Sequence, residues 1–185
     1  LKKLDLKKAR ANIPEFITKN LEYLDISCNN LEEIPFWILE QPNLKFLNVG
    51  SNQLKKLPNL SHLPLKTLKI HKNIEISNIP YLNLSIEHFN MFLLPKITKI
   101  PEQVLEMQKL KIFAFGQTSM CECPPIYLLK NLKWLVLTLN KFKSIPNKIN
   151  ELTNLEGLIL AKNELEYLPE SIGELKNLFF IWCKY

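Results

Sequence analysis

The side chains best suited to metal binding or to acid–base and nucleophilic catalysis are those of three histidines and four cysteines, and their spacing predicts no catalytic centre. None of His62, His71 and His88 has a second metal ligand at a usual spacing, and none lies in a nucleophile motif. The four glycines are isolated, so they cannot form a phosphate-binding loop or a dinucleotide fingerprint. We therefore expect no enzyme, no catalytic residue, no cofactor and no metal.

Two of the cysteines are close in sequence, in the segment Cys121-Glu122-Cys123. A zinc site normally needs four ligands, and a second pair of ligands is absent from the sequence. Cys123 precedes a proline at a position that is apolar elsewhere in the chain, which predicts a thiol in the core. The four cysteines form no paired framework, and this favours a reducing compartment, which we take to be the cytoplasm.

A repeat in the sequence predicts the secondary structure that would position a functional site. Eight pairs of an apolar residue followed by proline recur along the chain with their prolines 21 to 23 residues apart. The pairs are Ile13-Pro14, Ile34-Pro35, Leu57-Pro58, Ile79-Pro80, Ile100-Pro101, Cys123-Pro124, Ile145-Pro146 and Leu168-Pro169. A period of this length indicates a solenoid, whose units bury their apolar faces only against their neighbours. We expect one array over residues 1–185, with eight repeats and a truncated ninth. A soluble array normally has polar caps, and because neither end shows one we expect the array to be a fragment of a longer chain.

Within each repeat, leucine or an equivalent recurs at positions 1, 4 and 6, asparagine at 9, and apolar residues at 11 and 14. The copies begin at Leu1, Leu21, Leu44, Leu65, Ile86, Leu110, Leu132, Leu155 and Leu178. One full copy reads Leu132, Leu135, Leu137, Asn140, Phe142, Ile145, Pro146, Ile149 and Leu152. With these residues the chain resembles leucine-rich repeat proteins, in particular the intracellular 23-residue class of scaffolds that bind Ras-type GTPases.

The resemblance implies an α/β horseshoe with a concave parallel sheet, and the pattern of residues agrees with it. Alternation over positions 2 to 7 predicts about nine short strands. Proline fits the first turn of an outer helix, so we expect convex helices after Pro35, Pro101, Pro146 and Pro169. The segments 59–64 and 81–85 are too short for a helix and should be extended or 3₁₀. Leu94 and Thr118 occupy asparagine positions in the fifth and sixth copies, residues 86–131, and degeneration of these copies and a functional site are both open.

Positions 3 and 5 of the strands should face away from the core onto the concave sheet, which is the usual binding surface of such arrays. The N-terminal half of this surface is mainly polar, whereas the C-terminal half is largely apolar and aromatic. The candidate partner-binding residues are Tyr23, Phe46, His88, Ile112, Trp134, Val136, Ile159, Phe180 and Trp182. Asp5 and Asp25 face the same side, where they either clamp a cation or basic ligand or are solvated surface residues.

The composition is basic, with 24 Lys and Arg against 18 Asp and Glu and a net charge of +6. Lysine is spread through every repeat, so a solvated surface is the simpler interpretation and a nucleic acid partner is not expected. The chain has no apolar run long enough to cross a membrane.

An exposed apolar patch usually marks a protein interface, in which aromatic residues dominate the binding energy. We therefore expect a protein-interaction module in signalling or scaffolding, and the resemblance implies a signalling partner such as a small GTPase. Two alternatives stay open. The chain is the recognition segment of a larger enzyme, such as a kinase, a cyclase or a ubiquitin ligase, or another segment covers the apolar patch.

Overall fold

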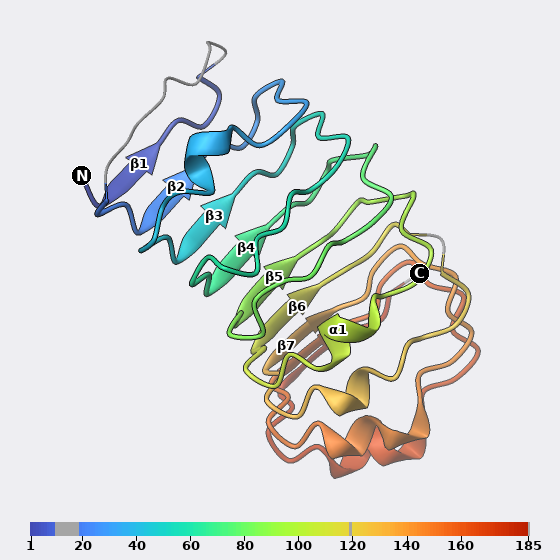
Figure 1. Ribbon diagram of the computed structural model, residues 1–185. Coiled ribbons are helices and arrows are strands. Elements are labelled where there is room, and N and C mark those ends of the chain that lie inside the picture. Colours follow the sequence, from blue (N-terminus) through green and yellow to red (C-terminus); the bar gives the residue numbers. More distant parts are fainter. Residues whose placement is uncertain (10–18, 119, 185) are drawn as a thin grey trace.

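The computed structural model describes residues 1–9, 19–118 and 120–184, and the Ile13-Pro14 pair lies outside them. The described residues contain nine strands, which form one parallel sheet in sequence order. The strands are β1 (Lys3–Asp5), β2 (Tyr23–Asp25), β3 (Phe46–Asn48), β4 (Thr67–Lys69), β5 (His88–Asn90), β6 (Ile112–Ala114), β7 (Trp134–Val136), β8 (Gly157–Ile159) and β9 (Phe180–Trp182). Figure 1 shows the coils stacked from the N-terminus to the C-terminus, so the predicted solenoid with a parallel sheet is confirmed.

The register of the sheet follows the leucine pattern without a slip. Lys3 pairs with Tyr23, Tyr23 with Phe46, and the series continues to Gly157 and Phe180, so position 3 of every repeat forms one column. The strands span positions 3 to 5 only, which is shorter than predicted. Their neighbours still bond to the adjacent coil, since the amide of Glu22 donates to the carbonyl of Lys2 over 2.9 Å.

Each of the first eight coils turns after the strand through a left-handed residue at position 8. The eight residues are Lys8, Cys28, Ser51, Lys72, Leu93, Gln117, Leu139 and Lys162, with φ between 55° and 59°. None of them is glycine, although side chains disfavour this conformation. Because eight different positions share one geometry, the stacking of coils dictates the turn rather than the residue type.

The core lies between the sheet and the convex segments. The side chains at positions 4 and 6 are fully buried in most coils, as for Leu24, Leu47 and Leu68. Coils five to seven add a continuous set of aromatic contacts: the ring centroids of Phe89 and Phe113 are 5.9 Å apart, and those of Phe113 and Phe115 are 5.1 Å apart. Bulky side chains thus fill the core where the repeat is least regular.

Asparagines at position 9 form a buried ladder along the solenoid. The Asn73 amide donates to the carbonyls of Val49 and Ile70 over 3.0 and 2.8 Å, and its Oδ1 accepts from the amide of Leu54 over 3.1 Å. At the irregular positions, Leu94 is a fully buried core residue, and the Thr118 hydroxyl donates to Asn140 Oδ1 over 2.7 Å. These departures are accommodated by packing and by hydrogen bonding.

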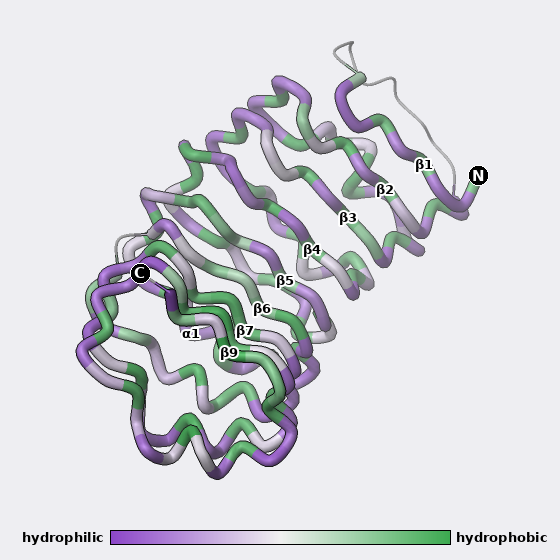
Figure 2. The backbone as a smooth tube through the Cα atoms, turned by 180° about the vertical axis from the view of Figure 1, so that it is seen from behind, coloured by the Kyte–Doolittle hydropathy of each residue, from purple (hydrophilic) through white to green (hydrophobic). Residues whose placement is uncertain are grey.

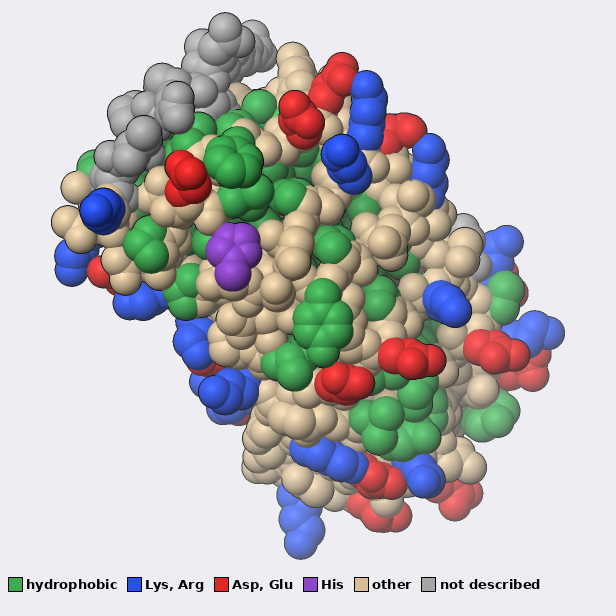
Figure 3. Space-filling view, in the orientation of Figure 1, with side chains coloured by type: hydrophobic (Ala, Val, Ile, Leu, Met, Phe, Trp, Pro, Cys, Tyr) green, Lys and Arg blue, Asp and Glu red, His purple; other side chains and the backbone are tan. Residues whose placement is uncertain are grey.

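The convex side carries short helical turns. They are η1 (Phe36–Ile38), α1 (Glu102–Leu105), η2 (Ile126–Leu128), η3 (Asn147–Glu151) and η4 (Glu170–Glu174), of which α1 is α-helical and the others are 3₁₀. The segments 59–64 and 81–85 contain no helix, as predicted. Figure 3, in the orientation of Figure 1, shows a face on which acidic and basic side chains are interspersed with apolar ones.

The role predicted for the prolines is wrong by one position. Pro35, Pro101 and Pro146 have ψ values of 134°, 138° and 136°, which are extended rather than helical, so each proline precedes the first helical residue as the N-cap. The fixed φ of proline suits this site, and its missing amide would have had no partner there. Glu102 and Glu170 lie in the first turns, where a carboxylate is favoured.

Candidate binding surface on the concave face

The sheet register brings all nine candidate residues to one face. We call the face that carries strand positions 3 and 5 the concave face. Figure 2 shows that the chain is more hydrophobic over β6 to β9 than over β1 to β5. The polar and apolar halves predicted from the sequence therefore lie next to each other on one continuous sheet.

Tyr23 and Phe46 form a stacked pair on the polar half. Their ring centroids are 4.1 Å apart, with an interplanar angle of 11°. Lys3 Nζ lies 4.5 Å from the Tyr23 ring centroid, and Lys69 Nζ lies 5.4 Å from that of Phe46, so a lysine covers each outer ring face. Burial, followed by the charges of Asp25 and Asp5, raises the pKa of the Tyr23 hydroxyl. The stack is assembled before any partner binds.

The prediction that Asp25 is either a ligand clamp or a solvated residue is wrong, because the side chain is buried in a hydrogen-bond network. Its Oδ1 accepts from the amide and the hydroxyl of Ser27 over 2.9 and 2.6 Å, and its Oδ2 accepts from the Asn48 amide over 2.8 Å. Asn48 is also buried, and its Oδ1 accepts from the amide of Gly50 over 3.0 Å. Asp5, which is exposed, accepts from the amide of Lys7 over 3.1 Å. These side chains stabilise the turn after the strand.

The apolar half is organised around Trp134. Its ring lies against Phe179 and Phe180, with centroids 5.9 and 6.0 Å away, and it covers Gly157. Sequence reasoning missed Phe179, which is 74% exposed. The available signal was its place in the repeat, since position 2 holds lysine or glutamate in every earlier copy.

The other candidates differ in exposure. Ile112, Phe180 and Trp182 are 38%, 40% and 50% exposed, although all are large and apolar. The remaining residues, Trp134, Val136, Ile159 and His88, are half-buried. We call Ile112, Trp134, Val136, Ile159, Phe180 and Trp182 the apolar patch.

Tyr23 and Phe46 form one aromatic cluster on this face, and Trp134, Phe179 and Phe180 form a second. A hollow of about 240 Å³ lies between the two aromatic clusters. It lies over β4 to β6 and is lined by Lys69, His88, Phe89, Asn90, Ile112 and Ala114. The sequence predicted only His88 and Ile112 as site residues here. Lys69 and Asn90 occupy strand position 5, so the sequence places them on the concave face. That they line a hollow depends on side-chain packing, which the repeat pattern does not predict.

The His71 side chain lies over Gly50 of the preceding coil. A Cβ on Gly50 would lie 2.2 Å from Cε1 of His71, so the imidazole occupies the space that the glycine leaves. Burial, followed by the positive charges of Lys69 and Lys72, lowers the pKa of His71. The imidazole is therefore neutral at physiological pH.

A row of charged residues runs along the N-terminal ends of the strands, at position 2. It reads Lys2, Glu22, Lys45, Lys66, Glu87, Lys111, Lys133, Glu156 and Phe179. Glu22 is 3.4 Å from Lys2 and 2.9 Å from Lys45, and Glu87 is 3.5 Å from Lys66 and 2.6 Å from Lys111. Lys133 pairs with Glu156 over 2.6 Å, and Phe179 takes the place of the next lysine.

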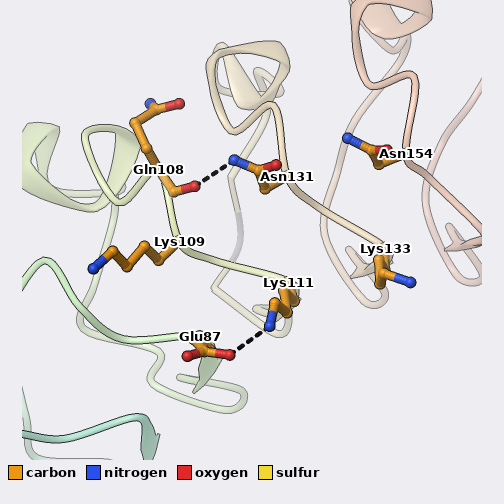
Figure 4. Close-up of a pocket in the computed structure, with 7 residues that line it drawn as sticks. All are labelled: Glu87, Gln108, Lys109, Lys111, Asn131, Lys133 and Asn154. Carbon is orange, nitrogen blue, oxygen red and sulfur yellow. Dashed lines mark hydrogen bonds and ion pairs between the residues drawn. The ribbon is translucent and has the colours of Figure 1, made fainter.

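A second hollow, of about 310 Å³, lies beside this row (Figure 4). Figure 4 shows the Lys111 and Glu87 pair together with the bond from the Asn131 amide to the carbonyl of Gln108, which is 2.7 Å long. Most of the polar side chains drawn there bond to a neighbouring coil, as Lys111 does to Glu87, Lys133 to Glu156 and Asn154 to the carbonyl of Lys130. They hold the coils together, so we do not include this hollow in the candidate binding surface.

The cysteines are free thiols, and burial raises the pKa of Cys123 to about 12, because this side chain packs against the core. Cys121 is exposed. Within residues 1–9, 19–118 and 120–184, no three His, Cys, Asp or Glu side chains are grouped so as to hold a metal ion. The helices of the described residues are single turns of three to five residues, and none of them could cross a membrane.

Residues 19–62 match a family model described as leucine-rich repeats in two copies. The structure of human trophoblast glycoprotein superposes with a TM-score of 0.74 over 99% of this chain and 77% of that one, at 16% identity. The fold is a leucine-rich repeat solenoid. The position-9 asparagines and the leucine columns described above are thus the framework of this fold, whereas the concave residues vary between coils.

Two curated relatives are similar in sequence to part of this chain. Toll-like receptor 2 type-2 of Gallus gallus is 32% identical over an alignment of 109 residues, which covers 55% of this chain and 14% of the receptor. Receptor-like protein 9b of Arabidopsis thaliana is 30% identical over an alignment of 151 residues, which covers 71% of this chain and 15% of that protein. The chain thus spans about one seventh of the length of these relatives. The matches support the leucine-rich repeat superfamily.

Proposed function

We propose that this leucine-rich repeat array is a non-enzymatic module that binds a protein partner on its concave face. The apolar patch anchors the partner, and the polar half, with its preassembled Tyr23 and Phe46 stack, orients it. Leucine-rich repeat arrays are typically interaction modules, and their concave surfaces are the usual binding sites. We place the module in signalling or scaffolding.

One observation carries this proposal. Ile112, which is 38% exposed, and the half-buried Trp134 and Ile159 lie on the concave side between flanking coils, and the buried core does not include them. Large apolar side chains that stay together in water mark interaction surfaces, and tryptophan is prominent among the residues that dominate binding energy.

The proposal names a protein partner without assigning it to the small GTPases. The relatives described above are receptors rather than Ras-binding scaffolds, so they give no support to that narrower class. A cytoplasmic location is part of the proposal, and the four free cysteines support a reducing compartment.

Replacing Ile112 by serine and Trp182 by alanine tests the proposal. Both side chains are exposed, so the fold should tolerate the changes. The wild-type chain is used to capture partners with a crosslinker, and the affinity of each purified partner is then measured by titration. We expect the double variant to bind at least roughly tenfold more weakly, because anchors of this kind each contribute strongly.

The matched control replaces Phe36 and Tyr167, which are 72% and 59% exposed but lie outside the concave strands, by alanine. This variant should bind the partner normally. A partner that depends on Phe36 and Tyr167 but not on Ile112 and Trp182 would place binding on another face and refute the proposal.

A further inference from the structure

The side chains that line the hollow between the two aromatic clusters supply positive charge but no negative charge. Its lining contains one cation, Lys69, and no carboxylate. An apolar wall formed by Ile112 and Ala114 closes it on the side of the apolar patch. A ligand group that enters the hollow therefore meets a positive charge on one side and aliphatic surface on the other.

The hydrogen-bond acceptors next to the hollow are already used by the protein itself. Asn90 Oδ1 accepts from the amide of Phe92 over 3.0 Å, as Asn48 Oδ1 does from Gly50. Both carboxylate oxygens of Asp25 are bound by Ser27 and Asn48. A basic or donor-rich ligand would thus find few free acceptors on this part of the face.

The hydrogen-bond donors, in contrast, remain available. Lys69 has no ion pair among the described residues, and its Nζ lies 5.4 Å from the ring centroid of Phe46. The side-chain nitrogen of Asn90 likewise has no partner in the described part of the chain. His88 Nδ1 is 3.4 Å from the Thr67 hydroxyl, and with that hydroxyl as donor the imidazole presents Nε2–H as a third donor.

The unpaired charged side chains around the hollow are positive, like Lys69 within it. The five lysines at position 2 from Lys2 to Lys133 each form an ion pair with a glutamate of that row, whereas Lys7, Lys69 and Lys72 have no ion pair among the described residues. The positive charges of these three lysines also act on His71, where Asp25 opposes them only partly. The concave face is therefore positive over β4 and apolar from β6 onward.

We infer that the concave face selects a partner segment in which an acidic side chain lies beside a bulky apolar one. The carboxylate sits in the hollow, bound by Lys69 and Asn90, and the apolar side chain packs on Ile112 and Trp134. Hydrogen bonds between a charged pair are stronger than neutral ones, and such a bond fixes the orientation of the segment along the array. This inference rests on the proposed function and specifies the chemistry of the partner.

The test uses a displayed library of short random peptides, selected on the folded wild-type chain. Enriched peptides are made as C-terminally amidated synthetic peptides, so that the only carboxylates are side chains. Their affinity is measured by fluorescence anisotropy. We expect Asp or Glu next to Leu, Phe or Trp, and a loss of roughly tenfold or more with Lys69→Gln, because a charge-assisted hydrogen bond is removed.

The matched control is Lys56→Gln, which removes the same charge from an exposed lysine outside the concave strands. It should leave the affinity unchanged. Lys69→Glu should shift the selection from acidic to basic peptides. Enrichment of apolar peptides that depend on Ile112 but not on Lys69 would refute this inference and leave the proposed function standing.

Two other results separate the possibilities further. If no enriched peptide depends on either Ile112 or Lys69, both the inference and the proposed function fail. If single-stranded DNA binds through Lys69 more tightly than any acidic peptide, with a steep loss of affinity in salt, the face binds nucleic acid instead and the inference is overturned.

Discussion

The ring of Trp134 covers Gly157 so closely that a Cβ atom on the glycine would lie 2.3 Å from Cε3 of the ring. Gly157 is directly opposite Trp134 in the sheet, since the two residues are Cα partners in β7 and β8. The absence of a side chain on one strand therefore determines where the largest side chain of the neighbouring strand lies. This pair therefore sets the position of the indole in the apolar patch.

Gly157→Ala should displace the indole of Trp134 and destabilise the protein by about 1–3 kcal/mol, because a well-packed site has no room for an added methyl group. Urea unfolding gives the free energy, and near-ultraviolet circular dichroism reports the ring. Gly173→Ala is the control, since a Cβ there meets no atom within 4 Å. That variant should be neutral or slightly stabilised, and equal losses in both variants would contradict the packing argument.

Asn73→Ala should lower the free energy of unfolding by about 2–4 kcal/mol, because two carbonyls and one amide lose their buried partner. Asn154→Ala removes one bond, from an exposed side chain to the carbonyl of Lys130, and should cost less than about 1 kcal/mol. Chemical denaturation measures both. Similar values would show that the buried ladder contributes no more than a surface bond.

The row of charges at position 2 gives the stability a pH dependence. Hydrogen bonds from Lys45 and Lys2 lower the pKa of Glu22, and the bond from Lys111 chiefly lowers that of Glu87. Because these pKa values are lower in the folded state, the stabilisation is present above about pH 4.3, the ordinary value for glutamate, and is lost as the pH falls through the folded pKa.

We therefore expect the double variant Glu22→Gln and Glu87→Gln to lose less stability than the wild type between neutral and acid pH. Thermal unfolding over a pH series measures the slope, and salt should reduce the difference because the pairs are largely exposed. Glu164→Gln, at an exposed glutamate with no ion pair among the described residues, should behave like the wild type. An unchanged slope in the double variant would show that the pairs do not stabilise the fold.

The thiols should react at very different rates. A pKa of about 12 for Cys123, in place of 9.0, lowers its thiolate fraction near neutral pH by roughly 1000-fold. In a variant with the other three cysteines replaced by serine, Cys123 should react with a disulfide reagent only after denaturation. A variant that keeps only the exposed Cys183 should react at once. Rapid reaction of Cys123 in the folded protein would place it outside the core.

The sequence was sufficient to predict the sheet and its register. Apolar residues at positions 4 and 6 must face the core in every coil, so the side chains at positions 3 and 5 are forced to the other face. The buried ladder could be predicted for the same reason, because asparagine both donates and accepts and thus satisfies a stacked turn.

The details of the site could not be predicted in this way. Asp25 and Asn48 lie at solvent-facing positions of the pattern, yet their bonds to each other and to the following turn bury them. The hollow over β4 to β6 depends on the small side chain of Ala114 beside Ile112, which is a relation between coils rather than a pattern within one. Proline position was misjudged because its φ suits both the N-cap and the first helical residue.

The left-handed turns have a consequence for engineering thermostability. Eight described coils pass through φ near 57° with a side chain in place, and glycine would relieve most of this strain at each of them. A consensus design that replaces exposed examples such as Lys162 would add small, independent gains along the array. The protein can thus be made more heat-resistant without altering a single leucine of the core or any strand residue of the concave face.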